Sequence, residues 1–251
     1  MKKIFVTWIM ACAAVCAMAV ELPKQGLGIQ IGWAQPILRI NNANSNPKDS
    51  LDVVVKMKGF KVGVVYDASF IAGFGASMGI NYTFGAYNSG WQIKNAYGMP
   101  YPRSRQLITY HQAEVFVDWQ YKFEVAKETY LMLYTGPTIQ CGIGLDMRAD
   151  HQAAQDAEII YTHYNGFVPD KNDPDPQKEN EHFRRLNVTW GVGVGFQYKR
   201  YFLRGGYDFG LIDPYANRQF VDAAGNPKDH YTRGRLDQWN IRIGIYLWYN
   251  D

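Results

Sequence analysis

The stretch "WGVGVGFQYKRYFLRGGYDFGL", residues 190–211, alternates between bulky and small residues. Bulky side chains occupy the even positions from Trp190 to Tyr198, and glycines occupy positions 191, 193 and 195 between them. Successive side chains of an extended strand point to opposite faces, so a period of two indicates a β-strand. The bulky face of this strand meets either a protein core or lipid, and the rest of the sequence decides between the two.

Seven further segments repeat this alternation, at residues 27–34, 60–66, 74–84, 113–123, 131–143, 201–211 and 239–249, which with 186–198 makes eight. Short turns near residues 67–72, 124–128 and 199–200 alternate with long polar stretches near 39–56, 85–104, 144–184 and 212–237. Bacterial outer-membrane barrels combine short periplasmic turns with long extracellular loops in this way. We therefore expect an all-β fold over residues 20–251: an eight-stranded antiparallel up-and-down transmembrane β-barrel in the cell outer membrane, with periplasmic termini.

Aromatic residues gather toward both ends of the expected strands. Tyr66, Tyr121, Tyr198 and Tyr249 fall near the short turns, and Trp33 and Trp239 among others fall near the long loops. Tyrosine and tryptophan prefer the two interfaces of a membrane, whereas a soluble lipocalin-like barrel gives no reason for two levels. The narrow interior of eight strands would also not hold so many rings. We expect the bulky face to contact lipid.

The first 19 residues have the pattern of an export signal. Lys2 and Lys3 precede a mostly apolar run, and Ala17-Met18-Ala19 offers a small-x-small cleavage site. Cleavage after Ala19 would lower the formal charge from +3 to +1, because 3 − 2 = 1, and would leave Cys141 as the last of three cysteines. We therefore expect a signal peptide at residues 1–19, no intrachain disulfide and no nucleic-acid partner.

Charged residues occur at positions that strand parity directs inward. They are Lys61, Glu114, Asp118, Lys122, Arg185, Arg204, Asp208 and Arg242. Buried charges are tolerated when they are paired and hydrogen-bonded, so we expect an ion-pair network that plugs the lumen. In this network Glu114 and Asp208 are the candidates for the acidic partner of Arg204. The alternative is that these charged residues line a path that conducts ions through the barrel.

Four segments carry a resemblance to a known family. They are "GFKVGVVYDASF" (59–70), "AEVFVDWQYKF" (113–123), "LYTGPTIQCGIG" (133–144) and "VGVGFQYKRYFLRGGYDFGLID" (192–213). Over roughly residues 57–250 the chain resembles the PorT-like outer-membrane β-barrel proteins of Gram-negative bacteria. The resemblance implies an eight-stranded outer-membrane barrel, and the family's namesake is similar to an accessory of a protein-secretion system. It supplies no site residues.

Signals for chemistry are weak in this sequence. The five histidines have no metal-like spacing, and "DKNDPDPQKENE" (170–181) lacks the turn glycine of a calcium loop. Ser104 and His111 come nearest to the nucleophile and base of an outer-leaflet lipid hydrolase. We expect no catalytic, metal or cofactor site. The expected protein contacts outer-membrane lipid and acts through its outer loops as a structural or partner-binding envelope protein, with a secretion-system accessory as the alternative.

Overall fold

The computed structural model describes residues 24–43, 52–71, 73–93, 102–168, 183–214, 220–221, 227–228 and 231–250. The expected signal peptide and the segment 170–181 lie outside these residues. Over the described ranges the secondary structure is almost entirely β-strand. No helix among the described residues is long and apolar enough to cross a membrane.

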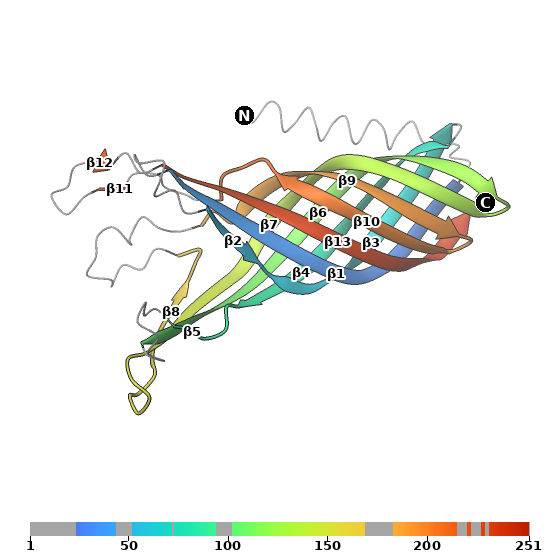
Figure 1. The fold of residues 1–251 in the computed structure, drawn as a ribbon. Helices are drawn as coiled ribbons and strands as arrows, with labels where there is room; N and C mark the ends of the chain where they lie inside the picture. Colours follow the sequence, from blue (N-terminus) through green and yellow to red (C-terminus); the bar gives the residue numbers. More distant parts are fainter. Residues whose placement is uncertain are drawn as a thin grey trace.

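Eight long strands close into an antiparallel ring (Figure 1). In ring order they are β1 (Lys24–Ala43), β3 (Lys58–Ile71), β4 (Phe74–Asn88), β6 (Arg103–Ala126), β7 (Thr129–Gln152), β9 (Leu186–Tyr198), β10 (Tyr201–Gly210) and β13 (Tyr231–Asn250). Each strand pairs with the next, and β13 returns to pair with β1. The predicted fold, an eight-stranded up-and-down barrel, is confirmed.

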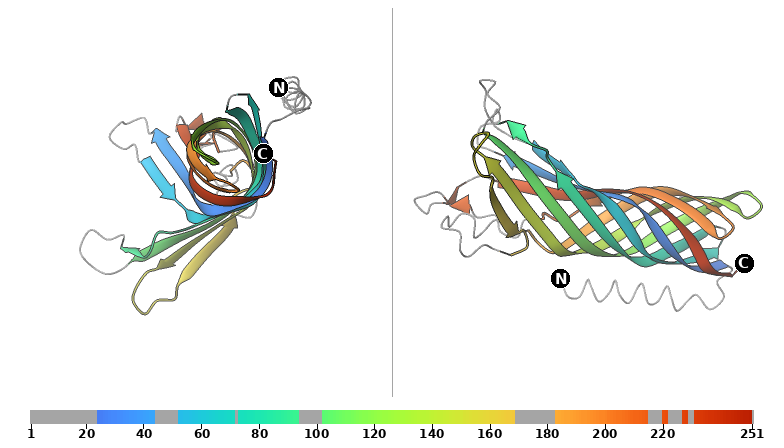
Figure 2. Two further views of the ribbon diagram at one scale, coloured as in Figure 1. Left: turned by 90° about the vertical axis from the view of Figure 1, so that its right-hand side faces the viewer. Right: turned by 90° about the horizontal axis from the view of Figure 1, so that it is seen from below.

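Short strands add to the end of the barrel that carries the long connections. β2 (Asp52–Lys56) pairs with β1, β5 (Gln92–Ile93) with β6, and β8 (Ile160–Asn165) with β7. β11 (Phe220–Val221) and β12 (Pro227–Lys228) form a separate small hairpin. Seen along the barrel axis, two groups of strands splay away from the closed ring (Figure 2).

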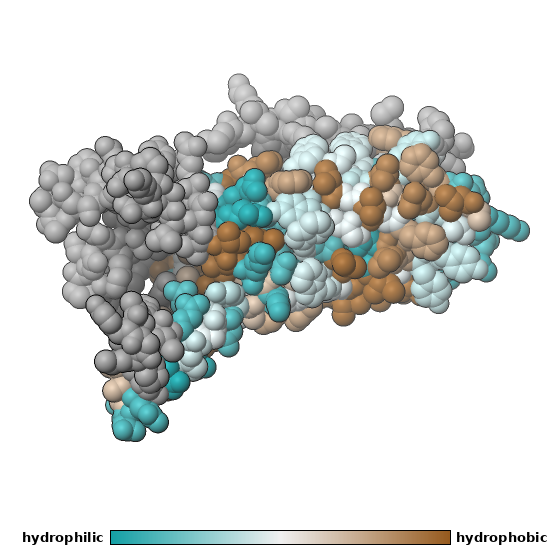
Figure 3. Space-filling view, viewed as in Figure 1, coloured by the Kyte–Doolittle hydropathy of each residue, from teal (hydrophilic) through white to brown (hydrophobic). Residues whose placement is uncertain are grey.

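The bulky face of the opening stretch points out of the barrel. Val194 is 57% exposed and Val192 45% exposed, while Gly191 and Gly195 on the other face are buried. The same outward exposure recurs in neighbouring strands, and apolar side chains cover much of the barrel wall (Figure 3). A soluble barrel would bury these side chains, so the outward face has the character expected for contact with lipid.

Strands extend into the regions predicted as long loops. β1 runs to Ala43, β6 begins at Arg103 rather than near residue 113, β7 runs to Gln152, and β13 begins at Tyr231. The predicted loop boundaries at residues 39, 144 and 237 are therefore wrong. The outer part of β7 carries Asp146, Arg148 and Asp150 on one face, and His151 and Gln152 follow. A segment with few apolar residues does not show the alternation of apolar and polar residues that predicts a strand.

Glycines of the opening stretch leave room in the lumen for Tyr134. A Cβ atom added at Gly193 would lie 2.2 Å from Tyr134 Cζ, and one at Gly206 would lie 2.7 Å from Tyr134 Oη. Both distances are shorter than van der Waals contact. Gly205 differs, because a Cβ atom there would meet nothing closer than 3.9 Å.

We expect Gly193→Ala to destabilise the barrel by about 1–3 kcal/mol, because the added methyl group overpacks against Tyr134. Gly205→Ala is the matched control and should change the free energy of unfolding by less than about 0.5 kcal/mol. Urea unfolding of the protein folded into lipid vesicles measures both. Equal effects of the two substitutions would contradict the inward placement of Gly193.

Candidate functional site

The lumen is filled by polar side chains. Of the eight residues predicted to lie there, seven are on the inward face and at most 9% exposed: Lys61, Glu114, Asp118, Lys122, Arg204, Asp208 and Arg242. Gln30, Gln112, Gln197 and Asn240 are buried among them. The lumen is therefore the largest concentration of polar groups in the described part of the chain, and it is the site that the sequence indicated.

Arg185 does not belong to this set, and its prediction as a lumen residue is wrong. Strand β9 begins one residue later, at Leu186, so strand parity no longer governs Arg185, which is exposed. Its guanidinium instead donates to the carbonyl oxygens of Gly142 and Ile143, at 3.2 and 3.1 Å, and lies 4.9 Å from the ring centroid of Phe167. Arg185 thus bonds to β7 beside its register shift and packs against the ring of Phe167.

Asp67 is the centre of the cluster nearest the short turns. Its carboxylate lies 3.0 Å from Lys122 Nζ and 3.1 Å from Arg204 Nη2, and it also accepts hydrogen bonds from Gln120 Nε2 and Tyr246 Oη. Asp67 is 1% exposed. Two cations and two neutral donors therefore compensate one buried carboxylate, as a low-dielectric interior requires.

Sequence analysis missed Asp67 because it was placed in a turn after residue 66. β3 in fact continues to Ile71, and Asp67 lies on the same face as Lys61, six residues earlier. Continuing the inward–outward alternation of β3 past residue 66 would have placed Asp67 on the inward face. The predicted partners of Arg204, Glu114 and Asp208, are wrong as a consequence.

Arg204 also spans the lumen from one wall to the other. Its Nη1 donates to Ser77 Oγ at 2.7 Å, which joins β10 to β4, the strand diametrically opposite in the ring. Farther along the axis, Gln112 Nε2 donates to Gln238 Oε1 at 2.9 Å and joins β6 to β13, another opposite pair. Bonds of this kind occupy the full width of the interior.

A second cluster surrounds Glu114. Its Oε2 forms an ion pair with Lys61 Nζ at 2.6 Å, and its Oε1 accepts hydrogen bonds from Thr83 Oγ1 at 2.8 Å and Gln238 Nε2 at 3.1 Å. Lys61 and Glu114 are both nearly inaccessible to solvent. The structure therefore brings these two predicted residues together, in a group separate from Asp67.

The remaining three predicted residues form looser contacts. Asp208 accepts a hydrogen bond from Asn240 Nδ2 at 3.0 Å, and Arg242 Nη2 donates to Tyr134 Oη at 3.4 Å. The Arg242 guanidinium lies 5.5 Å from the ring centroid of Phe116. Among the described residues Asp118 makes no ion pair within 4.0 Å.

Apolar side chains close the outer end of the lumen. They form one cluster of Leu38, Val55, Met57, Ile108, Tyr110, Leu145, Phe167 and Leu236, contributed by segments on both sides of the barrel mouth. All eight are buried. The polar interior is thus covered at this end by an apolar layer.

The candidate hydrolase pair does not form. Ser104 and His111 lie seven residues apart on the same strand, β6, about 23 Å at the usual rise of a strand. His111 is instead bonded through Nδ1 to Tyr82 Oη at 2.6 Å on the outward face. The described residues also contain no group of three or more His, Cys, Asp or Glu side chains placed to hold a metal ion.

No family model and no curated protein matches the sequence. Among solved structures, Ail, the attachment invasion locus protein of Yersinia pestis, crystallised with the heparin analogue sucrose octasulfate, is 11% identical. The match covers 89% of this chain and 99% of that one, with a TM-score of 0.35. Neisserial surface protein A is also 11% identical, with coverages of 89% and 99% and a TM-score of 0.33. The N-terminal β-barrel domain of Pseudomonas aeruginosa OprF is 8% identical, with coverages of 87% and 97% and a TM-score of 0.26.

We expect Arg204→Ala to destabilise the barrel by about 3–5 kcal/mol, because it leaves Asp67 under-compensated in the interior. Adding Asp67→Asn should recover part of that loss. Arg235→Ala is the control, because its side chain is 47% exposed and the buried Asp237 keeps its other partner, Arg39, so the loss should cost less than about 1 kcal/mol. Unfolding titrations of the wild type, Arg204→Ala, Asp67→Asn and the double variant measure the coupling, and strictly additive effects would contradict a direct Arg204–Asp67 interaction.

Proposed function

We propose that this protein is a non-enzymatic outer-membrane barrel with a plugged lumen, which acts through its outer strands as a structural or partner-binding protein of the envelope. Strand length is the observation that carries the proposal. A transmembrane β-strand needs about 9–11 residues. β6 and β7 have 24 residues each, whereas β10 has 10, so about half of each long strand remains beyond the membrane.

The surplus residues form two arms at the outer end of the barrel. The first arm consists of residues 35–43 of β1, 231–238 of β13 and β2. The second arm consists of residues 103–111 of β6, 144–152 of β7, β5 and β8. The bases of the arms pack together, since Leu38 of the first arm and Ile108 of the second share one buried apolar cluster. Beyond this cluster the arms splay apart in the view along the axis (Figure 2). Pairing between strands fixes the backbone of each arm, which favours recognition of a partner.

The second arm carries arginines interleaved with aromatic rings. Arg103 and Arg105 place their guanidinium carbons 4.6 and 4.9 Å from the ring centroid of Trp91, and Arg148 lies 4.9 Å from that of Tyr161. Tyr161 is 64% exposed. Tryptophan, tyrosine and arginine dominate the binding energy of protein interfaces, so this face supports a partner-binding role.

Asp150 holds two of these arginines, Arg105 and Arg148, in place. Arg105 Nε lies 2.7 Å from Asp150 Oδ2, and Arg148 Nε lies 2.6 Å from Asp150 Oδ1. Burial raises the pKa of Asp150, but the hydrogen bonds from Arg148 and Arg105 outweigh it and hold the pKa below its ordinary value. The carboxylate therefore stays charged in mildly acidic surroundings, and the arginine–aromatic face keeps its arrangement there.

The resemblance to PorT-like proteins supports a narrower form of this proposal, in which the partner belongs to a protein-secretion system. The hydrolase alternative loses its support, because Ser104 and His111 are separated along β6.

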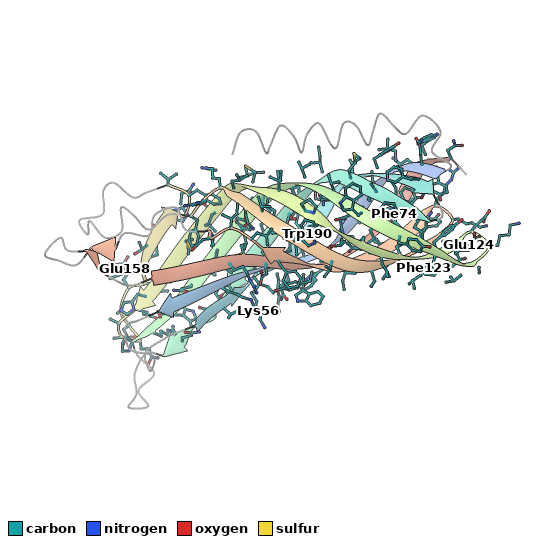
Figure 4. The ribbon with its side chains drawn as sticks, turned by 90° about the horizontal axis from the view of Figure 1, so that it is seen from above. Lys56, Phe74, Phe123, Glu124, Glu158 and Trp190 are labelled. Carbon is teal, nitrogen blue, oxygen red and sulfur yellow. The ribbon has the colours of Figure 1, made fainter. Side chains whose placement is uncertain are left out.

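Orientation is tested by chemical labelling of two glutamate positions at opposite ends of the barrel (Figure 4). In a Cys141→Ser background, Glu158→Cys, between β7 and β8, should react in intact cells with a polymer-linked maleimide too large to enter the periplasm. Glu124→Cys, near the β6–β7 turn, should react only after the outer membrane is breached. Labelling of Glu124→Cys in intact cells would overturn the proposed orientation.

Partner binding is tested by placing a photo-crosslinking residue at Tyr161 in the second arm. We expect discrete protein adducts in intact cells, which Arg105→Ala should weaken because Trp91 then loses one of its two flanking cations. The control position is Leu133 on the barrel wall, which should yield no equivalent protein adduct. Identical adduct patterns from both positions would argue against a specific partner at this arm.

A further inference from the structure

A cleft of about 420 Å³ lies at the short-turn end of the barrel, far from the two arms. Its walls come from the β6–β7 turn, the β9–β10 turn and the end of β13. The lining side chains include Glu128, Lys199, Arg200, Tyr130, Tyr201 and Tyr249. The cleft is within the size range of small-ligand sites, and it combines a few charged groups with aromatic walls as such sites do.

The β6–β7 and β9–β10 turns, which line the cleft, are hydrogen-bonded to each other. Glu128 and Lys199 have φ values of 57° and 53°, and they are the two non-glycine residues with positive φ in the described ranges. Lys199 N–H donates to the Glu128 carbonyl oxygen at 2.9 Å, and Tyr246 N–H donates to the Arg200 carbonyl oxygen at 2.8 Å. Positive φ is the usual geometry of tight hairpin turns. The first of these bonds joins the two turns, and the second joins the β9–β10 turn to β13.

An irregularity of β13 supplies the aromatic wall. The β1–β13 register shifts between Leu27 and Gly28, so Tyr249 turns inward and stacks on Tyr246 with ring centroids 5.3 Å apart. The prediction that Tyr249 belongs to the outward aromatic belt is therefore wrong. Tyr201 remains outward and is 59% exposed. The cleft thus joins the mouth of the lumen to the outward surface.

The charges in the cleft are complementary to a zwitterion. Lys199 Nζ and Glu128 Oε2 are 3.8 Å apart, at the limit of an ion pair, and both side chains are about half exposed. Arg200 is exposed and has no ion pair within 4.0 Å among the described residues. Two cations can therefore face a phosphate, while the carboxylate of Glu128 can face an ammonium group.

The position of the cleft indicates where such a zwitterion would come from. The outward residues next to it are apolar, with Leu203, Ile243 and Leu247 exposed along β10 and β13. Acyl chains can lie along these side chains while a headgroup enters the cleft. The exposed Tyr198 and Tyr201 mark the level of a membrane interface. A lipid headgroup therefore reaches this cleft without leaving the bilayer.

We propose that this cleft binds the headgroup of a phosphatidylethanolamine lipid of the inner leaflet. Arg200 and Lys199 bind its phosphate through charge-assisted hydrogen bonds, and Glu128 accepts hydrogen bonds from its primary ammonium group. The inference rests on the proposed function in one respect, since the turn end must face the periplasmic leaflet. A trimethylammonium headgroup has no N–H donor and therefore cannot donate a hydrogen bond to Glu128.

The experiment measures lipid retention by the full-length mature protein in native mass spectrometry. The protein is offered phosphatidylethanolamine, phosphatidylcholine or phosphatidylglycerol with identical acyl chains. We expect wild-type protein to retain phosphatidylethanolamine about tenfold more than phosphatidylcholine, the ratio that one hydrogen bond to a charged group supplies. Equal retention of these two lipids would overturn the proposal.

Two variants and two matched controls assign the contacts. Glu128→Gln should abolish the preference for phosphatidylethanolamine over phosphatidylcholine, and Arg200→Ala should weaken retention of every phospholipid. Glu124→Gln and Lys127→Ala, which alter charges near the same turn end but outside the cleft lining, should behave as wild type. If the variants and the controls lost lipid retention equally, the overall charge of the turns, and not this cleft, would be what binds the lipid. Phosphatidylglycerol retained as strongly as phosphatidylethanolamine, with no effect of Glu128→Gln, would overturn the role of Glu128.

Two further readouts separate failure of the site from failure of the fold or orientation. Resistance of the barrel to unfolding by dodecyl sulfate at room temperature shows that each variant is folded. The maleimide labelling of residue 124 shows which way the barrel is inserted. A folded, correctly oriented protein without a phosphatidylethanolamine preference contradicts the lipid site alone.

Discussion

The narrow interior of an eight-stranded barrel is the constraint on which the rest of this structure depends. Every second residue of each strand points into a space that one layer of side chains fills. Each inward residue must therefore fit against the opposite wall, and each buried charge must be compensated. The glycines around Tyr134 meet the first requirement, and the groups around Asp67 and Glu114 meet the second. Both are consequences of closing the ring with eight strands.

The same constraint organises the interior into layers along the axis. Asp67 and its donors lie near the turns, the Lys61–Glu114 group lies farther along, and Arg242 lies against aromatic rings between them. The apolar cluster around Tyr110 and Leu145 covers the outer mouth. Because Arg204 and Gln112 bond to strands on the opposite wall, the lumen stabilises the ring from inside. The polar and charged side chains of the lumen thus link opposite walls of the barrel.

Much of the fold could be predicted from the sequence, because alternation along a strand is a local pattern. The eight strands and their outward faces follow from it. The outer ends of β6 and β7 could not be read in this way, since residues such as Arg148 and Asp150 are polar and mark no face as apolar. The prediction for Arg185 failed because it assumed that parity continues past the first residue of β9. Tyr249 was misplaced by a register shift, which depends on the pairing of two strands and leaves no periodic signal in either one.

Candidate partners in the lumen were harder to predict than its members. Parity identifies the face on which Arg204 lies, but the stagger between strands sets the height of each residue along the axis. Asp67 and Arg204 meet across the barrel although 137 positions separate them in the chain. A periodic pattern in one strand gives no information about contacts so far apart in the sequence. The partner of Arg204 among Glu114, Asp208 and Asp67 could therefore be identified only from the structure of the closed barrel.

The register shift of β7 beside Arg185 has a mechanical consequence. It lies where His111 and Gln112 of β6 pair with Gly144 and Gly142 of β7, so one residue of β7 has no partner at the point where the second arm leaves the barrel. Such a bulge bends a strand without interrupting the ladder on either side. β6 and β7 therefore run as one antiparallel hairpin from the β6–β7 turn to the tip of the arm, and their pairing is interrupted where Val117 and Asp118 lie opposite Gly136 and Pro137. A force on the second arm would therefore be carried into the barrel wall along both strands, and the bonds of Arg185 to Gly142 and Ile143 would resist bending at the bulge.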